Sequence, residues 1–399
     1  MRVLVVHNRY SAATPSGENV SVDLEVEGLC AAGVEVHRHE VSNDDVLSGG
    51  VVDKLRAAAA TTWSPGAAAR LDAEIDRIRP DIVHVHNLFP LLTASVPARA
   101  LARGLPVVWT ARNLRVTCVE GTQFRAGTDC RLCRPGWRVP GIRHRCYRGS
   151  LGASVLVTGA TSLFRRIART RVTTVAISDA MARWLVDEAG FDPARVHVKY
   201  NAVATPTDVP APAPGTCDTF LFVGKFAAYK GIDLLLDAWS RVQADNARLR
   251  FVGDGPMAAT VRAATADPRV TWAGHVPAAE VLREIAAARA VVVPSVWDEP
   301  FGRVVAEAFA MGRPAITTGR GALAEVVDRA GWVTGTDPEG LARAIDEAAA
   351  SDALVDERGA AGRQRHQAEF SLDASISRLL AIYDAALGEA AGQSRRPVH

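Results

Sequence analysis

The chain has 399 residues, of which 48% are hydrophobic and 23% charged, and its formal net charge is +2. This composition is typical of a folded globular protein and excludes a disordered one, while the length exceeds one ordinary core and predicts two domains. The small net charge argues against a protein whose main partner is a nucleic acid.

The start of the chain does not resemble a signal peptide, because the apolar run VLVV after Met1-Arg2 is too short. No later stretch approaches the roughly 20 apolar residues that span a bilayer. We therefore expect a cytoplasmic protein, reaching at most the inner face of the membrane, with its six cysteines reduced.

The first half alternates short apolar runs, typical of buried strands, with amphipathic helical stretches. Strands are predicted at residues 3–7, 34–40, 81–86, 105–111 and 174–178. Helices are predicted at 20–32, at 72–78 and from Asp179 onward. The alternation indicates a mostly parallel sheet covered by helices on both faces, so residues 1–203 form one α/β domain.

Residues 204–216 are rich in Pro and Ala and predict a semi-extended linker. The alternation then begins again. Strands are predicted at 219–225, 249–253, 270–274, 290–295 and 314–318, and helices at 232–243, 257–264, 281–288 and 303–311. A second α/β domain therefore spans 217–370, followed by an amphipathic helix at 371–388 and a tail at 389–399. Ligands of such sheets bind beyond the carboxyl ends of the strands.

The strongest chemical signal is the segment EPFGRVVAE, which joins a predicted strand to a predicted helix. Gly302 allows the backbone to approach a ligand closely, and the free N–H groups at the start of a helix attract anions. Glu299 before the helix and Glu307 two turns into it can accept hydrogen bonds from sugar hydroxyls. These residues predict a ligand pocket.

Two lysines, Lys225 and Lys230, lie between a predicted strand and the next helix, where their ammonium groups could hold a diphosphate. A pair of lysines alone is more often part of the solvated surface. The glycine turn beside them and the second helix start at Gly302 favour an anion site.

The segments VGKF…KG, VGDGP and EPFGRVVAE, with AFAMGRPAITT and GALAEVV after them, resemble the large GT4 group of retaining glycosyltransferases. The resemblance covers nearly the whole chain. It implies the GT-B fold, which is an α/β fold of two facing Rossmann-like domains with parallel sheets, an interdomain cleft and a C-terminal helix that returns to the first domain. It also implies sugar transfer from a UDP- or GDP-sugar to a hydroxyl acceptor in polysaccharide or glycoconjugate biosynthesis.

The same resemblance implies which residues form the donor site. The residues implied in donor binding are Gly17, Lys225, Lys230, Val276, Glu299, Phe301, Gly302 and Glu307. The two lysines would hold the diphosphate and Glu307 the ribose. Glu299 would hold the sugar, and the backbone near Val276 would meet the base. Catalysis would need no metal and no organic cofactor, because the departing phosphate itself helps to deprotonate the acceptor.

Two histidines, His84 and His86, alternate along a predicted strand, so their side chains lie on the same face of the sheet. A histidine in a strand is more often a satisfied structural group than a catalyst, and we predict that role for His84. His86 lies at the carboxyl end of the strand. The resemblance implies that it contacts the donor sugar and acts with Lys230 and Glu299 as a catalytic residue.

Residues 112–150 form an insertion with four cysteines, Cys118, Cys130, Cys133 and Cys146, spaced C-x11-C-x2-C-x12-C. Two thiolates in a C-x2-C pair can reach one ion, and two more complete a tetrahedral structural zinc site. Disulfides, redox thiols and plain free cysteines are the alternatives. The nine arginines of this insertion favour a phosphate-rich partner such as a lipid-linked acceptor or an anionic membrane surface. A solvated basic face is the alternative.

Three other functions fit parts of the sequence. A nucleotide-dependent dehydrogenase would require a GxGxxG turn after a first strand, which neither half contains. A nucleotide-sugar epimerase on the same fold would need no acceptor. A zinc-bearing nucleic-acid binder would use the basic insertion, but it would not need the paired glutamates.

Overall fold

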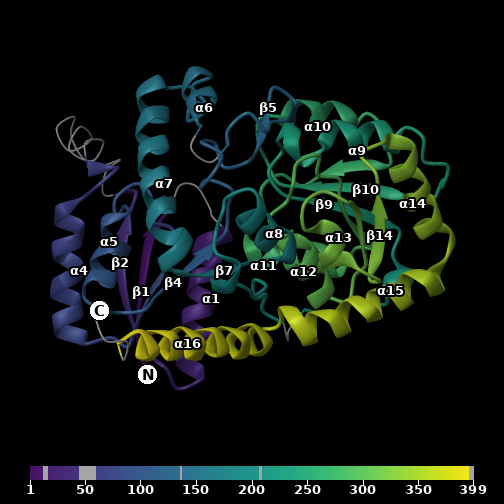
Figure 1. Ribbon diagram of the computed structural model, residues 1–399. Helices are drawn as coiled ribbons and strands as arrows, with labels where there is room; N and C mark the ends of the chain where they lie inside the picture. The colour runs from purple at the N-terminus through teal and green to yellow at the C-terminus, as the bar shows by residue number, and fades with distance from the viewer. Residues whose placement is uncertain (12–16, 45–59, 135–136, 206–208, 395–399) are drawn as a thin grey trace. The chain divides into compact units, whose positions relative to one another are not determined.

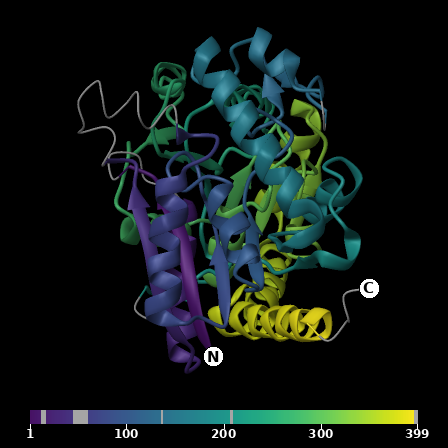
Figure 2. The ribbon, with the colours of Figure 1, turned by 60° about the vertical axis from the view of Figure 1, so that its left-hand side comes forward.

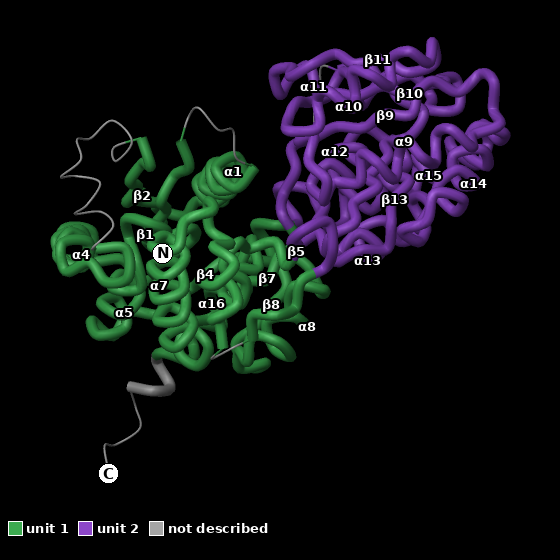
Figure 3. Tube along the Cα trace, turned by 90° about the horizontal axis from the view of Figure 1, so that it is seen from above, with its two compact units in different colours: residues 1–123, 130–200, 375–399 green, residues 124–129, 201–374 purple. Residues whose placement is uncertain are grey.

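The computed structural model describes residues 1–11, 17–44, 60–134, 137–205 and 209–394. The chain divides into two compact units, coloured green and purple in Figure 3. Unit 1 consists of residues 1–123, 130–200 and 375–399, and unit 2 consists of residues 124–129 and 201–374. The linker predicted at 204–216 follows the change of unit at residue 201, although its residues 206–208 lie outside the described part.

The core of unit 1 is a six-stranded sheet in the order β2-β1-β3-β4-β7-β8, in which every neighbouring pair is parallel. Its strands are β1 (Arg2–Arg9), β2 (Glu35–Ser42), β3 (Ile82–Val85), β4 (Val107–Ala111), β7 (Thr173–Ala176) and β8 (Val196–Val198). The sequence predicts the first five of these but not β8, which is only three residues long and half-buried.

The helices of unit 1 are α1 (Gly17–Ala31), α4 (Pro65–Ile78), α5 (Ser95–Ala102), α6 (Val139–Arg143), α7 (Leu151–Arg171), α8 (Asp179–Asp187) and α16 (Leu372–Ser394). Helix α4 begins seven residues before the predicted start, because Ser64 caps it and Pro65 occupies its first turn. Helix α7 was not predicted. Its buried positions, which include Val157 and Phe164, follow helical spacing, but arginines and glycines interrupt the pattern.

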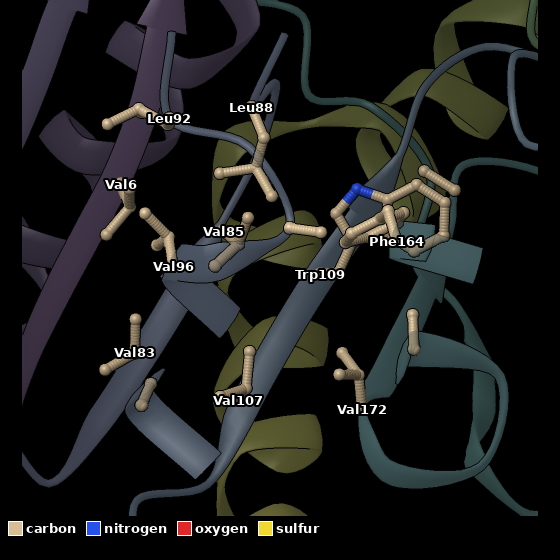
Figure 4. Packing of buried hydrophobic residues seen from close by; sticks show 14 of the residues in the cluster. Val6, Val83, Val85, Leu88, Leu92, Val96, Val107, Trp109, Phe164 and Val172 are labelled. Atoms are coloured by element: carbon tan, nitrogen blue, oxygen red, sulfur yellow. The ribbon is translucent and has the colours of Figure 1, made fainter. Parts of the chain in front are cut away.

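One face of this sheet packs against α4, α5 and α7, and α4 and α5 lie side by side in Figure 1. Alternate residues of the strands, such as Val83 and Val85, point to this side (Figure 4). Trp109 of β4 packs edge-on against Phe164 of α7, with ring centroids 4.8 Å apart. The other set of alternate residues contains His84, which faces α1 and α16 instead.

The core of unit 2 is a second six-stranded parallel sheet in the order β11-β10-β9-β12-β13-β14. Its strands are β9 (Thr219–Val223), β10 (Arg248–Val252), β11 (Val270–Trp272), β12 (Ala290–Val293), β13 (Ala315–Thr318) and β14 (Gly331–Thr334). Numbered along the unit, this is the order 3-2-1-4-5-6 of dinucleotide-binding sheets. The two parallel sheets confirm the predicted α/β fold class.

The helices of unit 2 are α9 (Ile232–Trp239), α10 (Ala258–Ala264), α11 (Ala278–Ala286), α12 (Arg303–Ala310), α13 (Leu323–Val327), α14 (Pro338–Ala350) and α15 (Asp352–Arg365). A two-stranded hairpin, β5 (Phe124–Arg125) and β6 (Thr128–Asp129), also belongs to this unit. The Phe124 ring lies edge-on to that of Tyr229, and Asp129 forms an ion pair with Arg320.

The C-terminal helix is longer than predicted. Helix α16 continues to Ser394, so the prediction that a tail begins at residue 389 is wrong. Residues 389–391 are Glu-Ala-Ala, which favour helix, and Glu389 forms an ion pair with Arg195 at 2.8 Å. The N-terminus lies beside α16 in Figures 1 and 2. Among the described residues, the helices all fall short of the length and apolarity needed to cross a membrane.

A buried ionic network joins α1, β3 and the segment after β8. Glu25 of α1 is 3% exposed, and its Oε2 accepts a hydrogen bond from the Lys199 ammonium at 2.6 Å. His84 and Arg112 lie 3.5 Å from the same carboxylate. Burial by itself would raise the pKa of Glu25, but the charges of Lys199 and Arg112 lower it to about 2. Glu25 is therefore a buried anion held by buried cations.

His84 connects this network to α16. Its Nδ1 shares a hydrogen bond with the Tyr383 hydroxyl at 2.6 Å, and its Nε2 shares one with the Thr110 hydroxyl at 2.8 Å. Burial lowers the pKa of His84 to about 4, although Glu25 opposes this change. Both ring nitrogens of the neutral imidazole are thus satisfied, which confirms the structural role predicted for His84.

We expect the stability of unit 1 to fall as the pH drops from 6.5 to 4. In this window the unfolded His84 takes up a proton while the folded His84 stays neutral, so the unfolded state binds more protons. Urea unfolding at pH 7.5 and pH 5, followed by tryptophan fluorescence, should show a smaller loss of unfolding free energy for His84→Gln than for the unaltered protein. Replacement of the exposed His144 by Gln is the control. Equal losses in all three proteins would contradict the prediction.

Candidate active site

The strand order of unit 2 brings two catalytic candidates to the same place. The connections from β9 and β12 leave in opposite directions along the sheet, which makes the edge between these two strands a topological switch point. Lys230 follows β9, and Glu299 follows β12. Because the sheet is parallel, both residues lie beyond the carboxyl ends of neighbouring strands, where ligands of such sheets bind.

Lys230 and Glu299 form a direct ion pair. The Lys230 ammonium donates to Glu299 Oε1 at 2.5 Å, and the Ser295 hydroxyl donates to the same oxygen at 2.7 Å. The ammonium also lies over the rings of Trp297 and Tyr229, at 5.3 and 5.8 Å from their centroids. The Glu299 side chain is 8% exposed and that of Lys230 is 25% exposed, so the cation is the more accessible partner.

Gly321 fixes the backbone of Glu299. The two residues form a parallel bridge, and the N–H of Ala322 donates to the Glu299 carbonyl at 2.8 Å. A Cβ at Gly321 would lie 2.4 Å from that carbonyl oxygen, and the residue has φ +62°. Only glycine fits such a close contact in the left-handed region. The segment GALAEVV therefore positions the glutamate from the loop after β13.

Gly231 brings the loops after β9 and β12 into contact in the same way. Its φ is +76°, and a Cβ there would lie 1.8 Å from the carbonyl oxygen of Pro294. Lys230 is the residue before this glycine, so the close approach of the two loops delivers its side chain to Glu299.

The second glutamate lies on the helix that follows Glu299. Gly302 precedes the first turn of α12 in the left-handed conformation, and Glu307 accepts from the Arg303 guanidinium at 2.8 Å. Burial raises the pKa of Glu307, and Arg303 opposes this change. The helix start and the carboxylate thus lie on one short element.

The other predicted donor residues lie on several elements of the two units. Lys225 is exposed in the loop after β9, and Val276 is half-buried in the loop after β11. Phe301 is buried, with its ring edge-on to Phe370 at 5.6 Å between centroids. Gly17 is the exposed first residue of α1 in unit 1. Of the predicted donor residues, Lys230 and Glu299 are thus joined directly within unit 2.

Four residues of this centre escaped the sequence analysis, namely Tyr229, Ser295, Trp297 and Arg303. Arg303 and Ser295 each lie four residues before the glutamate that they contact, so their spacing could have indicated them. Tyr229 directly precedes Lys230, and Trp297 lies two residues before Glu299. An aromatic residue close in sequence to a predicted charged site residue is the pattern that could have indicated them.

His86 lies at the corresponding switch point of unit 1, between β1 and β3. Its ring is 4.2 Å from that of His84, centroid to centroid, which confirms that both point to the same face. Its two ring nitrogens have no hydrogen-bond partner among the described residues, and Nε2 is 3.4 Å from Glu25. Burial lowers the pKa of His86 well below its usual value, and the nearby cations add to this.

A pocket opens beside His86 within unit 1. Its lining includes Trp109, Arg112, Arg115 and Phe164. Aromatic faces next to guanidinium groups can accommodate a ligand that has both apolar and anionic parts. His86 is thus a neutral, unpartnered imidazole at the edge of a mixed pocket.

One group of potential metal ligands has converging atoms. In the described part of the chain, Glu25, His84 and His86 form the only set of three or more whose ligand atoms lie within 4.8 Å of one another. The Lys199 ammonium already neutralises Glu25 at 2.6 Å, and Arg112 adds a second cation. A further cation would be repelled there, so we read this group as an ionic network.

Comparisons with known proteins identify the family. The family model described as Glycosyltransferase Family 4 matches residues 15–206, and the model described as Glycosyl transferases group 1 matches residues 217–351. A D-inositol 3-phosphate glycosyltransferase of Geodermatophilus obscurus is 34% identical to this chain in the matched region. That region covers 54% of this chain and 53% of the relative, so the match spans about half of the relative's length. The protein of the same description from Nocardioides sp. is 27% identical over 90% of this chain and 86% of its own.

Solved structures show the same fold. The crystal structure of Anabaena HepE in complex with UDP is 14% identical and covers 96% of this chain and 100% of its own, with a TM-score of 0.68. The two family models together match most of the chain, in the two units that each contain a parallel sheet. The chain therefore belongs to the GT4-type glycosyltransferases of GT-B fold.

Proposed function

We propose that this glycosyltransferase moves a sugar from a nucleoside-diphosphate sugar to a hydroxyl acceptor with retention of anomeric configuration. The observation that carries the proposal is the Lys230–Glu299 pair at the switch point between β9 and β12. A cation for phosphate, a carboxylate for sugar hydroxyls and the start of α12 converge there. A UDP- or GDP-sugar is the donor class that this set suits, and the related HepE structure contains UDP.

The two charges of the pair have complementary tasks. In the unliganded molecule Lys230 and Glu299 neutralise each other, and Ser295 and Gly321 hold the carboxylate in place. A donor diphosphate would draw the more exposed ammonium toward itself. Glu299 would then be free to accept hydrogen bonds from the sugar. Donor binding would thus replace the Lys230–Glu299 ion pair by a contact of Lys230 with the diphosphate and a contact of Glu299 with the sugar.

During transfer, the bond between the anomeric carbon and the phosphate oxygen breaks, and a bond to the acceptor oxygen forms on the same face. The electron pair of the broken bond stays on the nucleoside diphosphate. The proton of the acceptor hydroxyl passes to the departing phosphate. Lys230, Lys225 and the N–H groups at the start of α12 stabilise the developing negative charge, an electrostatic contribution of several kcal/mol. This mechanism requires no protein nucleophile and no metal.

Glu307 contributes to binding of the nucleoside. Its carboxylate is oriented by Arg303 and can accept hydrogen bonds from the two ribose hydroxyls. The backbone near Val276, at the end of β11, is proposed to meet the base.

The pocket beside His86 is proposed to receive the acceptor, with His86 near the transferred sugar. Arg112 and Arg115 suit an acceptor that carries a phosphate, and Trp109 and Phe164 suit an apolar portion. A lipid-linked acceptor of polysaccharide or glycoconjugate biosynthesis, reached at a membrane surface, combines these two properties.

We expect one class of nucleotide-sugar to raise the melting temperature of the protein selectively. A ligand that binds only the native state stabilises it by mass action, by about 2.7 kcal/mol at a concentration one hundred times Kd. A thermal-shift panel of UDP-, GDP-, ADP- and dTDP-sugars measures this, with the free sugars as controls. The absence of a shift with every nucleotide-sugar would contradict the proposed donor class. If the nucleotide-sugar that raises the melting temperature is epimerised in the absence of an acceptor, the proposal of sugar transfer is wrong.

We expect Glu307→Ala and Lys230→Ala each to lower turnover of that donor at least about tenfold, or about 1.4 kcal/mol. Release of the nucleoside diphosphate measures turnover. The matched control is Glu357→Ala, since Glu357 is exposed on α15 of the same unit. Full turnover in both variants would show that the donor site lies elsewhere, provided that their circular dichroism and melting match the control.

A further inference from the structure

The four cysteines of the insertion lie in unit 1 and are all free thiols. Cys118, Cys130, Cys133 and Cys146 are each partly buried. Leu114, Val116 and Val119 at the start of the insertion are buried, but Leu132, Trp137 and Val139 are exposed by 48%, 61% and 49%. The part around Cys130 and Cys133 therefore has little apolar packing, and a bound metal would stabilise its fold.

Backbone contacts join the cysteines in two pairs. The N–H of Gln123 donates to Cys118 Sγ at 3.3 Å, and the N–H of Cys130 donates to the Gln123 carbonyl at 2.7 Å. Gln123 therefore links Cys118 to Cys130.

The second pair meets at Gly141. The N–H of Cys146 donates to the Gly141 carbonyl at 2.9 Å, and the Gly141 N–H donates to the Arg138 carbonyl at 3.1 Å. A Cβ at Gly141 would lie 3.2 Å from Cys133 Sγ, so the glycine allows the sulfur to approach the backbone. Backbone N–H groups aimed at sulfur stabilise a thiolate, and outer-shell hydrogen bonds of this kind orient metal ligands.

Gly141 also brings the two pairs together. A Cβ there would lie 2.5 Å from Val119 Cγ2, and Val119 is the residue after Cys118. Arg138 is only 4% exposed. Its guanidinium bonds to the Thr161 hydroxyl, while its Nη2 has no hydrogen-bond partner among the described residues.

An anion beside a buried guanidinium with an unsatisfied nitrogen is favourable. Among the described residues no carboxylate is recorded in an ion pair with Arg138, which is close in sequence to Cys133. Four thiolates around a divalent ion carry a net charge of −2, and such a site would place an anion near this guanidinium.

We propose that Cys118, Cys130, Cys133 and Cys146 bind one structural zinc ion. The four thiols would release their protons to solvent on binding. Zinc–sulfur distances of about 2.3 Å in a tetrahedron bring the sulfurs to within about 4 Å of one another. In the described part of the chain the cysteines do not yet form a group of three sulfurs within 4.8 Å, so rotation of their side chains must complete the site. With four thiolates the ion has no open position for substrate and acts on folding.

Metal analysis of the purified full-length chain tests the proposal. About one zinc per chain is expected, and the double variant Cys130→Ser/Cys133→Ser should lose it. The matched control is Cys30→Ser/Cys217→Ser, because these two thiols lie outside the insertion. Much less than one zinc per chain in the unaltered protein, or an unchanged zinc content in the insertion variant, would overturn the proposal.

A second measurement remains valid if the insertion variant fails to fold. In the native protein a thiol reagent should react rapidly with about two cysteines, and a chelator should raise this number to about six and lower the melting temperature. Cobalt substituted for zinc should give a thiolate-to-metal absorption band. Two reactive thiols with no response to the chelator would indicate disulfides and overturn the zinc site.

Discussion

Parallel strand pairing is the constraint on which the arrangement of this protein depends. In both units every neighbouring pair of the main sheet is parallel, so each strand must be followed by a crossover and all carboxyl ends lie on one edge. Loops that are far apart in the sequence therefore meet at that edge of the sheet. Where the direction of the crossovers changes, the loops separate and leave room for a ligand. Lys230 and Glu299 occupy that position in unit 2, and His86 occupies it in unit 1.

The buried charges of unit 1 are the most costly feature of the fold. An isolated Glu25 carboxylate in the core would be strongly unfavourable, and it is tolerated because Lys199 and Arg112 compensate it. The network ties α1, the segment after β8 and, through His84 and Tyr383, the C-terminal helix to one point of the sheet. Such a network adds little net stability over apolar packing, but removal of one partner would be severely destabilising. It specifies which helices may pack on this face.

The proposed donor site of unit 2 also pairs opposite charges, but closer to the surface. The pair of Lys230 and Glu299 is only partly buried, so its charges can be redirected to a ligand without leaving an unpaired ion in the core. Ser295 and Gly321 hold the carboxylate while the lysine stem lies against two aromatic rings. The carboxylate is thereby held in one orientation, which would reduce the free-energy cost of binding the proposed donor.

The sequence by itself determined the two α/β sheets and most of their strands, because the period of apolar residues is a local property. The donor motif, inferred from glycine position and charge, stays a prediction. Helix α7 and the short strands β8 and β14 were missed, since their patterns are interrupted or too short. Only the tertiary structure decided which groups pair. Tyr383 bonds to His84 across 299 residues, Lys199 to Glu25 across 174 and Lys230 to Glu299 across 69. No local pattern encodes such partners, because each is selected by the packing of elements that meet only when the sheets have formed.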